Sequence, residues 1–123
     1  MDPKAYFQQL AELPYEDVKV RVSETLQQFY EASSEDRANR MKGMLMALSE
    51  TSEETHTKVI KARFEAISEQ PDEVSSQLMA TGSQVLASLP SNVIEREQRL
   101  IQKVSPELSA AAKNLVQSFL QNT

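Results

Sequence analysis

Glu53 and His56 are the residues best suited to metal chemistry, because they are spaced as Glu-x-x-His. Residues three apart project from one face of a helix, and carboxylate-bridged di-iron bundles use this spacing to bind metal. Such a site needs two of these motifs and two further inward-facing glutamates, whereas the chain contains one histidine. A second copy of the chain would have to supply the other half. We expect no bound metal, with Glu53 and His56 as the candidate pair and His56 as a solvent-exposed residue in the first turn of a helix.

Other catalytic arrangements are missing from the sequence. The chain has no cysteine, so it offers no thiolate nucleophile and no cysteine ligands for zinc. Its serines fit helix caps and polar helix faces, and a single histidine is available as a base. Neither phosphate-binding glycine motif occurs, and the chain has two glycines in all. We therefore expect a protein that is not an enzyme and takes no cofactor.

The elements that carry these residues are predicted to be helices. Five prolines separate long segments in which apolar residues recur with helical spacing. We expect an all-α fold of six or seven short amphipathic helices packed as antiparallel pairs, either as a helical bundle or as a short solenoid-like stack. A length of 123 residues fits one all-helical domain, 1–123. The expected helix starts are Pro3, the residues after Pro14, Ser33-Ser34, Thr51, Pro71, Pro90-Ser91 and Ser105.

Three of these segments need particular attention. Residues 18–22 alternate as a strand would, but Val18, Val22, Leu26 and Phe29 continue as a helical stripe, which favours a helix. Thr51 begins a T-x-x-E capping box. The last helix is expected to start at 105–107 and to carry an apolar stripe ending at Phe119.

An internal repeat appears when the fourth helix is moved 19 positions onto the third, which aligns 42–50 with 61–69. Lys, Ala, Ser and Glu match at equivalent positions. Gly43, Ala62 and Gly82 then place a small residue near the middle of three successive helices, as at close helix crossings. Capped amphipathic helices of equal length also resemble one another without being repeats. Both explanations fit stacked antiparallel helices.

The charge pattern of the sequence is relevant to nucleic-acid binding. Thirteen Lys and Arg stand against 18 Asp and Glu, a net charge of −5, which disfavours wide contact with phosphate backbones. Arg96, Arg99 and Lys103 nevertheless lie along one helical face and form a possible basic face. Because acids are interleaved with the bases, we expect an ordinary solvated helix face. A small helical regulator that binds nucleic acid is the alternative function.

The sequence predicts a cytoplasmic protein. Its first residues lack the apolar run of a secretion signal. The longest uncharged stretch, 74–94, contains several Ser, Gln and Thr residues and Pro90, so we expect no membrane span.

The remaining hypothesis is a non-catalytic protein–protein interaction module, such as an adapter, a regulatory subunit or an assembly factor. Methionine side chains adapt to irregular surfaces and recur where partners bind. Met44 belongs to the expected core stripe of the third helix, whereas Met46 points away from it. We expect Met44, Met46 and Phe119 to contribute to the interaction surface. The partner is a protein of unknown identity or a second copy of the chain.

Overall fold

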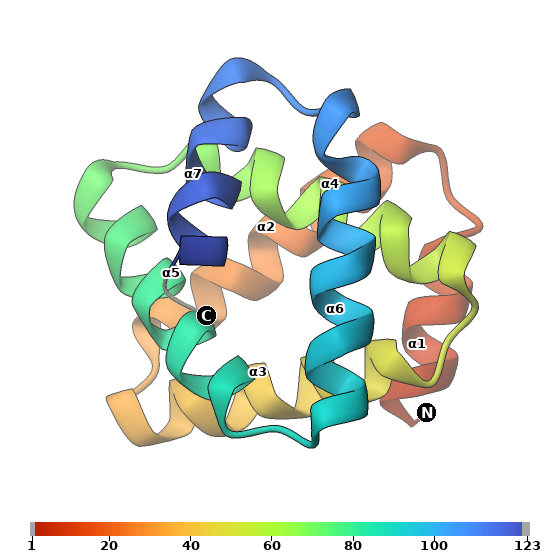
Figure 1. Ribbon diagram of the computed structural model, residues 1–123, viewed down its shortest axis with the longest axis horizontal. Helices are drawn as coiled ribbons and strands as arrows, with labels where there is room; N and C mark the ends of the chain where they lie inside the picture. Colours follow the sequence, from red (N-terminus) through yellow and green to blue (C-terminus); the bar gives the residue numbers. More distant parts are fainter. Residues whose placement is uncertain (1, 122–123) are drawn as a thin grey trace.

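The computed structural model describes residues 2–121, which form seven α-helices and one short 3-10 helix, with no strand among them (Figure 1). This confirms the all-α prediction. The elements are α1 (Pro3–Leu10), α2 (Tyr15–Glu31), α3 (Ser34–Ser49), α4 (Glu53–Ser68), α5 (Asp72–Ala87), α6 (Ser91–Val104), η1 (Ser105–Glu107) and α7 (Ala110–Gln121).

The alternating segment 18–22 lies within α2, as the helical stripe predicted. Val18 and Val22 are buried because they are four residues apart on one helical face. Val20 lies on another face and is 54% exposed. The alternation therefore reflects an exposed valine on a helix.

Six consecutive helices, α2 to α7, begin at a constant interval of 19 residues. The central members, α3, α4 and α5, are each 16 residues long, and three linking residues follow each of them. The 19-residue offset noticed between α3 and α4 thus extends through most of the chain as a spacing of helix starts.

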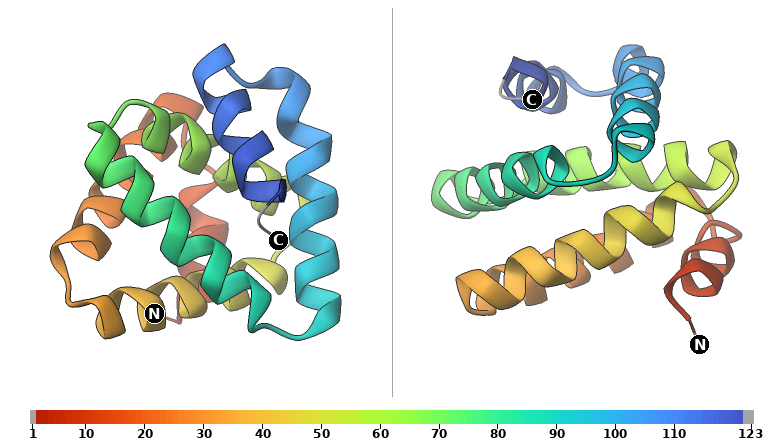
Figure 2. Two further views of the ribbon diagram at one scale, coloured as in Figure 1. Left: turned by 60° about the vertical axis from the view of Figure 1, so that its left-hand side comes forward. Right: turned by 60° about the horizontal axis from the view of Figure 1, so that its bottom comes forward.

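Successive helix pairs are stacked. In the right-hand view of Figure 2, α2 and α3 form the lowest tier, α4 and α5 the middle tier, and α6 and α7 the upper tier. The strongest packing accordingly joins helices two apart in the sequence, α2 with α4, α4 with α6 and α3 with α5. Consecutive helices reverse direction, and α1 lies beside α3 at one end of the stack.

The hydrophobic core runs through all three tiers and receives buried side chains from each of the seven helices. The middle helix α4 contacts every other α-helix, and nine of its residues are buried. Three of these buried residues, Thr55, His56 and Arg63, are polar.

Two predicted helix starts are wrong by a few residues. The N-cap of α4 is Ser52, whose hydroxyl accepts from the backbone N–H of Thr55 at 3.1 Å. Thr51 instead turns back and donates to the carbonyl of Leu48 at 2.7 Å. The segment at 105–107 forms the separate 3-10 helix, and α7 begins after Ser109, whose hydroxyl accepts from Ala112 N–H. Serine and threonine hydroxyls can both satisfy the free N–H groups at a helix start, so the sequence alone did not select between neighbouring candidates.

A close helix crossing at Gly43 is not found. A Cβ atom at Gly43 would have no neighbour within 4 Å, whereas one at Gly82 would meet Phe119 Cε2 at 3.5 Å, an ordinary contact. Ala62, the third small residue, is fully buried. The small residues therefore have different surroundings despite their even spacing.

We expect Gly43→Ala to raise the free energy of unfolding by about 0.5–1 kcal/mol, because alanine restricts the unfolded chain and meets no steric obstacle in the helix. Chemical denaturation followed by circular dichroism would measure the gain. Gly82→Ala, whose new methyl group makes an ordinary contact, should behave similarly. A loss of stability in Gly43→Ala would show that the backbone there is not an unstrained helix.

Within residues 2–121, no helix combines the length and the apolar character needed to cross a membrane.

Candidate functional site

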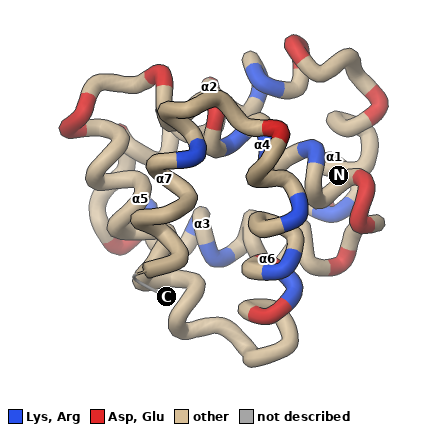
Figure 3. The backbone as a smooth tube through the Cα atoms, turned by 45° about the horizontal axis from the view of Figure 1, so that its top comes forward, with Lys and Arg blue, Asp and Glu red and all other residues tan. Residues whose placement is uncertain are grey.

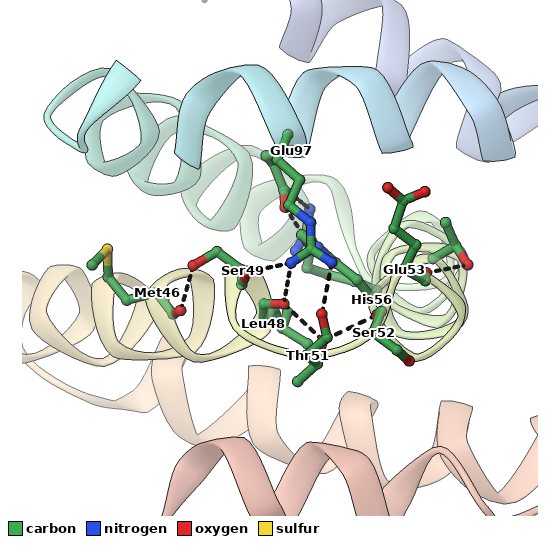
Figure 4. Close-up of polar contacts among 11 residues, drawn as sticks. Met46, Leu48, Ser49, Thr51, Ser52, Glu53, His56 and Glu97 are labelled. Atoms are coloured by element: carbon green, nitrogen blue, oxygen red, sulfur yellow. Dashed lines mark hydrogen bonds and ion pairs between the residues drawn. The ribbon is translucent and has the colours of Figure 1, made fainter. Parts of the chain in front are cut away.

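The main buried polar cluster joins α4 to α6 (Figure 4). Glu97 of α6 accepts hydrogen bonds from two residues of α4, with Oε1 lying 2.7 Å from His56 Nε2 and Oε2 paired with Arg63 Nη2. His56 and Glu97 are 1% exposed, and Arg63 is 6% exposed. The buried ion pair and the histidine form one network, which we call the Glu97 network.

The helical periodicity of α4 and α6 places these three side chains together. His56 and Arg63 are seven residues apart, two turns of helix, so they share one face of α4. Glu97 lies on the apolar face of α6 that also buries Val93, Leu100 and Val104. Packing α4 against α6 therefore brings the carboxylate between the two bases.

The pKa of Glu97 is lowered to about 2. Burial alone would raise it, but the Arg63 charge and the hydrogen bond from His56 outweigh burial. Glu97 is therefore a carboxylate, and His56 Nε2 carries the proton that it donates to Oε1. Two further nitrogens of the network, His56 Nδ1 and Arg63 Nη1, have no hydrogen-bond partner.

The prediction that His56 is solvent-exposed is wrong. The helix-start position suggested exposure, yet its side chain turns into the interface with α6. Glu53 lies elsewhere, nearly half exposed, and accepts from Arg99 Nη2 at 2.9 Å. In the part of the chain that the structure describes, no three carboxylate or imidazole groups gather where they could hold a metal ion. A metal shared between two copies would need His56 at the surface, where it does not lie.

The three residues of the proposed basic face make two different kinds of contact. Arg96 is partly buried and donates to the last two carbonyls of α3, Leu48 O at 3.1 Å and Ser49 O, and to Thr51 O at 2.6 Å in the link to α4. Figure 4 labels these three acceptor residues. Arg99 and Lys103 are exposed and pair with Glu53. The hydrogen bond from Arg99 lowers the pKa of Glu53. Much of the positive charge of Arg96, Arg99 and Lys103 is therefore met by groups of the same chain.

Two more basic side chains donate hydrogen bonds to carbonyl groups at the C-terminal ends of other helices. Lys58 Nζ donates to Ala11 O and Leu13 O, at 2.8 and 2.7 Å, just beyond the end of α1. Arg37 donates to the carbonyls of Phe29, Tyr30 and Ala32 at the end of α2. The final turns of α1 and α2 contain no basic residue. Cations from later positions therefore neutralise the negative ends of these helices.

The three predicted interaction residues lie at different depths. Phe119 is 5% exposed and stacks edge-on against Phe64 at a centroid distance of 5.8 Å. Met44 is buried, and Met46 is half-buried and packs against the core. These residues do not form one continuous surface.

Met44 does, however, line a shallow groove of about 380 Å³ between α1, α2 and α3, which we call the aromatic groove. Tyr6 lies on its rim, 39% exposed, with its ring 5.2 Å from that of Phe7. Gly43 supplies an open segment of helix, and Arg40 is its one charged lining residue. The full lining is Pro3, Tyr6, Phe7, Phe29, Arg40, Gly43 and Met44.

Sequence reasoning missed the aromatic groove and Glu97. A signal for Glu97 is present, because it is an acid at a position where the apolar stripe of α6 requires a buried residue. Tyr6 and Gly43 gave no comparable signal, since the groove exists only when α1 lies beside α3.

The surroundings of Tyr15 should change the pH at which its phenol ionises, which can be followed by absorbance. Burial first, and then the nearby carboxylates of Glu65, Glu16 and Glu69, raise its pKa to about 12. We therefore expect a component of the tyrosinate absorbance at 295 nm that develops near pH 12, beyond the ordinary tyrosine range. Tyr15→Phe should remove this component, whereas Tyr6→Phe should leave it in place. A titration that is unchanged in Tyr15→Phe would contradict the assignment.

Comparisons with protein-family models, with curated proteins and with solved structures gave no match.

Proposed function

We propose that the chain is a non-catalytic protein–protein interaction module that binds its partner through the aromatic groove. The supporting observation is the exposed Tyr6 ring beside the open helix at Gly43. Among residues 2–121, Tyr6 and Val20 are the large hydrophobic residues that remain exposed, and Tyr6 is the one that lines a groove.

The composition of the groove supports a protein as the occupant. The centres of protein interfaces are depleted in charge and enriched in aromatic residues, methionine and arginine. The groove offers Tyr6, two phenylalanines and Met44, with Arg40 as a single charge. The matching partner is a protein segment that presents an apolar side chain to the rings and a carboxylate to Arg40.

Gly43 provides a test that preserves the fold. Gly43→Gln adds a side chain to open space and improves helix propensity, so the free chain should stay folded while the groove is filled. Tyr6→Ser removes the exposed ring. Val20→Ser is the matched control, because Val20 is exposed but does not line the groove.

The experiment is quantitative capture of proteins from the source lysate on the immobilised wild-type chain and the three variants. We expect a protein that Gly43→Gln and Tyr6→Ser each bind at least tenfold less and that Val20→Ser binds normally. Capture that survives both groove variants would contradict the proposal. Sedimentation of the purified chain identifies a second copy as the occupant if self-association disappears in Gly43→Gln.

A further inference from the structure

A small apolar cavity lies inside the stack, among residues of α2, α3, α4, α5 and α7. Its volume is about 30 Å³, room for one small group. Met41, Met44 and Met79 contribute to its wall, and methionine side chains can change shape at low cost. Arg63 is the one charged residue of the lining.

Arg63, which lines this cavity, has an unused hydrogen-bond donor. Its Nη2 is paired with Glu97, but Nη1 is buried and has no partner. A buried donor without an acceptor is destabilising, and more so when the group is charged. An oxygen atom in the cavity would remove that cost.

The cavity is separated from a much larger surface groove by two side chains. Met79 and Phe119 line both the cavity and an outer groove of about 610 Å³ between α5 and α7. None of the described residues that line this outer groove is Lys, Arg, Asp or Glu, and Figure 3 shows α5 and α7 with few charged positions. Its size is that of a small-molecule site.

The charge of the Glu97 network indicates what kind of oxygen fits. Glu97 is a carboxylate, and it already balances the Arg63 guanidinium. An anion placed beside Arg63 would add an uncompensated buried charge, which is costly. A neutral carbonyl or hydroxyl oxygen accepts from Nη1 without that cost.

We propose that the cavity and the outer groove together bind an uncharged amphiphile, a medium-chain ketone or alcohol. Its oxygen lies in the cavity and accepts from Arg63 Nη1, and its carbon chain lies in the outer groove between α5 and α7. Entry requires movement of Met79, which has three rotatable side-chain bonds. This site shares one wall residue, Met44, with the aromatic groove, but it requires no protein partner.

The test is a titration of the purified chain, carrying ¹³C-labelled methionine methyl groups, with 2-octanone. We expect saturable shifts of the Met41 and Met79 signals, and none at Met46, which does not line either space. n-Octane, which has the same number of carbons but no oxygen, should bind at least tenfold more weakly. Shifts at Met79 without Met41 would restrict the probe to the outer groove and overturn the proposal. No saturable shift, equal affinity for octane, or a shift at Met44 without Met41 would also overturn it.

Two variants identify the contacts. Arg63→Lys keeps a charge beside Glu97 but removes the guanidinium fork, so 2-octanone should lose its advantage over octane. If Arg63→Lys does not fold, Gly82→Ala serves, because its new methyl group lies 3.5 Å from Phe119 Cε2 and narrows the entrance. We expect Gly82→Ala to weaken 2-octanone binding several-fold. Unchanged binding in the variant that folds would overturn the assignment.

Because the titration contains no partner and is read from Met41 of α3 and Met79 of α5, neither of which lines the aromatic groove, its failure leaves the proposed protein interaction untouched. Loss of capture in Gly43→Gln likewise says nothing about ketone binding.

Discussion

Glu97→Gln is expected to lower the free energy of unfolding by about 3–5 kcal/mol, the usual effect of removing one partner from a buried ion pair. The glutamine amide keeps the shape of the side chain but leaves the buried Arg63 charge uncompensated. The glutamine amide has one oxygen and one NH₂ group where the carboxylate has two oxygens. The NH₂ group, itself a donor, would therefore face a donor nitrogen of His56 or Arg63.

Denaturant unfolding followed by circular dichroism would measure this loss. Glu95→Gln is the matched control, because Glu95 lies on the exposed side of the same helix. We also expect the combined variant His56→Leu, Arg63→Met and Glu97→Leu to recover most of the stability, since apolar residues of similar volume can replace a buried ionic cluster. Equal stability of Glu97→Gln and Glu95→Gln would show that the network contributes little.

The pH dependence gives an independent measure of the same carboxylate. The pKa of Glu97 in the folded chain is about 2, below the ordinary value of 4.5. A carboxylate with a lowered folded pKa stabilises the native state above its ordinary pKa, and this stabilisation is lost as the pH falls from about 4.5 towards 2. The wild-type chain should therefore lose more stability than Glu97→Gln between pH 5 and pH 2. Parallel curves for the two chains would contradict the lowered pKa.

The helices were predictable because their apolar stripes are long and their starts carry proline, serine and acidic residues. The stripe from Val18 to Phe29 correctly outweighed the strand-like alternation of 18–22. Exact starts were less predictable, since neighbouring Thr51 and Ser52 can both cap a helix. Ser52 has the extended backbone from which its hydroxyl reaches Thr55 N–H, whereas the hydroxyl of Thr51 donates to Leu48 O.

The polar interior was not predicted, for a different physical reason. His56 was interpreted from its distance along the chain to Glu53, whereas its partner Glu97 lies 41 residues away. A single sequence gives the positive charge of Arg63 but not its depth in the fold. Such pairings depend on which helix packs against α4, and the apolar stripes do not specify that neighbour.

The same limit applies to the basic residues of α6. Arg96 and Arg99 are three residues apart and were both placed on a basic face, yet Arg96 donates to the end of α3 while Arg99 pairs with Glu53 at the surface. Helix α3 has no basic residue in its last turn, and Arg96 supplies the positive charge beside its terminal carbonyls. The two arginines therefore differ in energetic role.

Arg96→Met is accordingly expected to lower the free energy of unfolding by about 2–4 kcal/mol. It removes a charged donor from Leu48 O, Ser49 O and Thr51 O, and hydrogen bonds to charged groups contribute about 1.5–3 kcal/mol each before overlap among them. Methionine retains the apolar stem, so the change isolates the guanidinium.

Arg99→Met is the matched control on the same helix, and it should cost much less stability than Arg96→Met because it breaks an exposed ion pair. Denaturant unfolding of both variants at low and high salt would separate the two roles. The loss in Arg96→Met should persist at high salt, since its partners are carbonyl groups in a partly buried site, whereas screening should remove the smaller effect of Arg99→Met. Equal losses in the two variants would mean that Arg96 contributes only surface charge, and the end of α3 would then need no cation from α6.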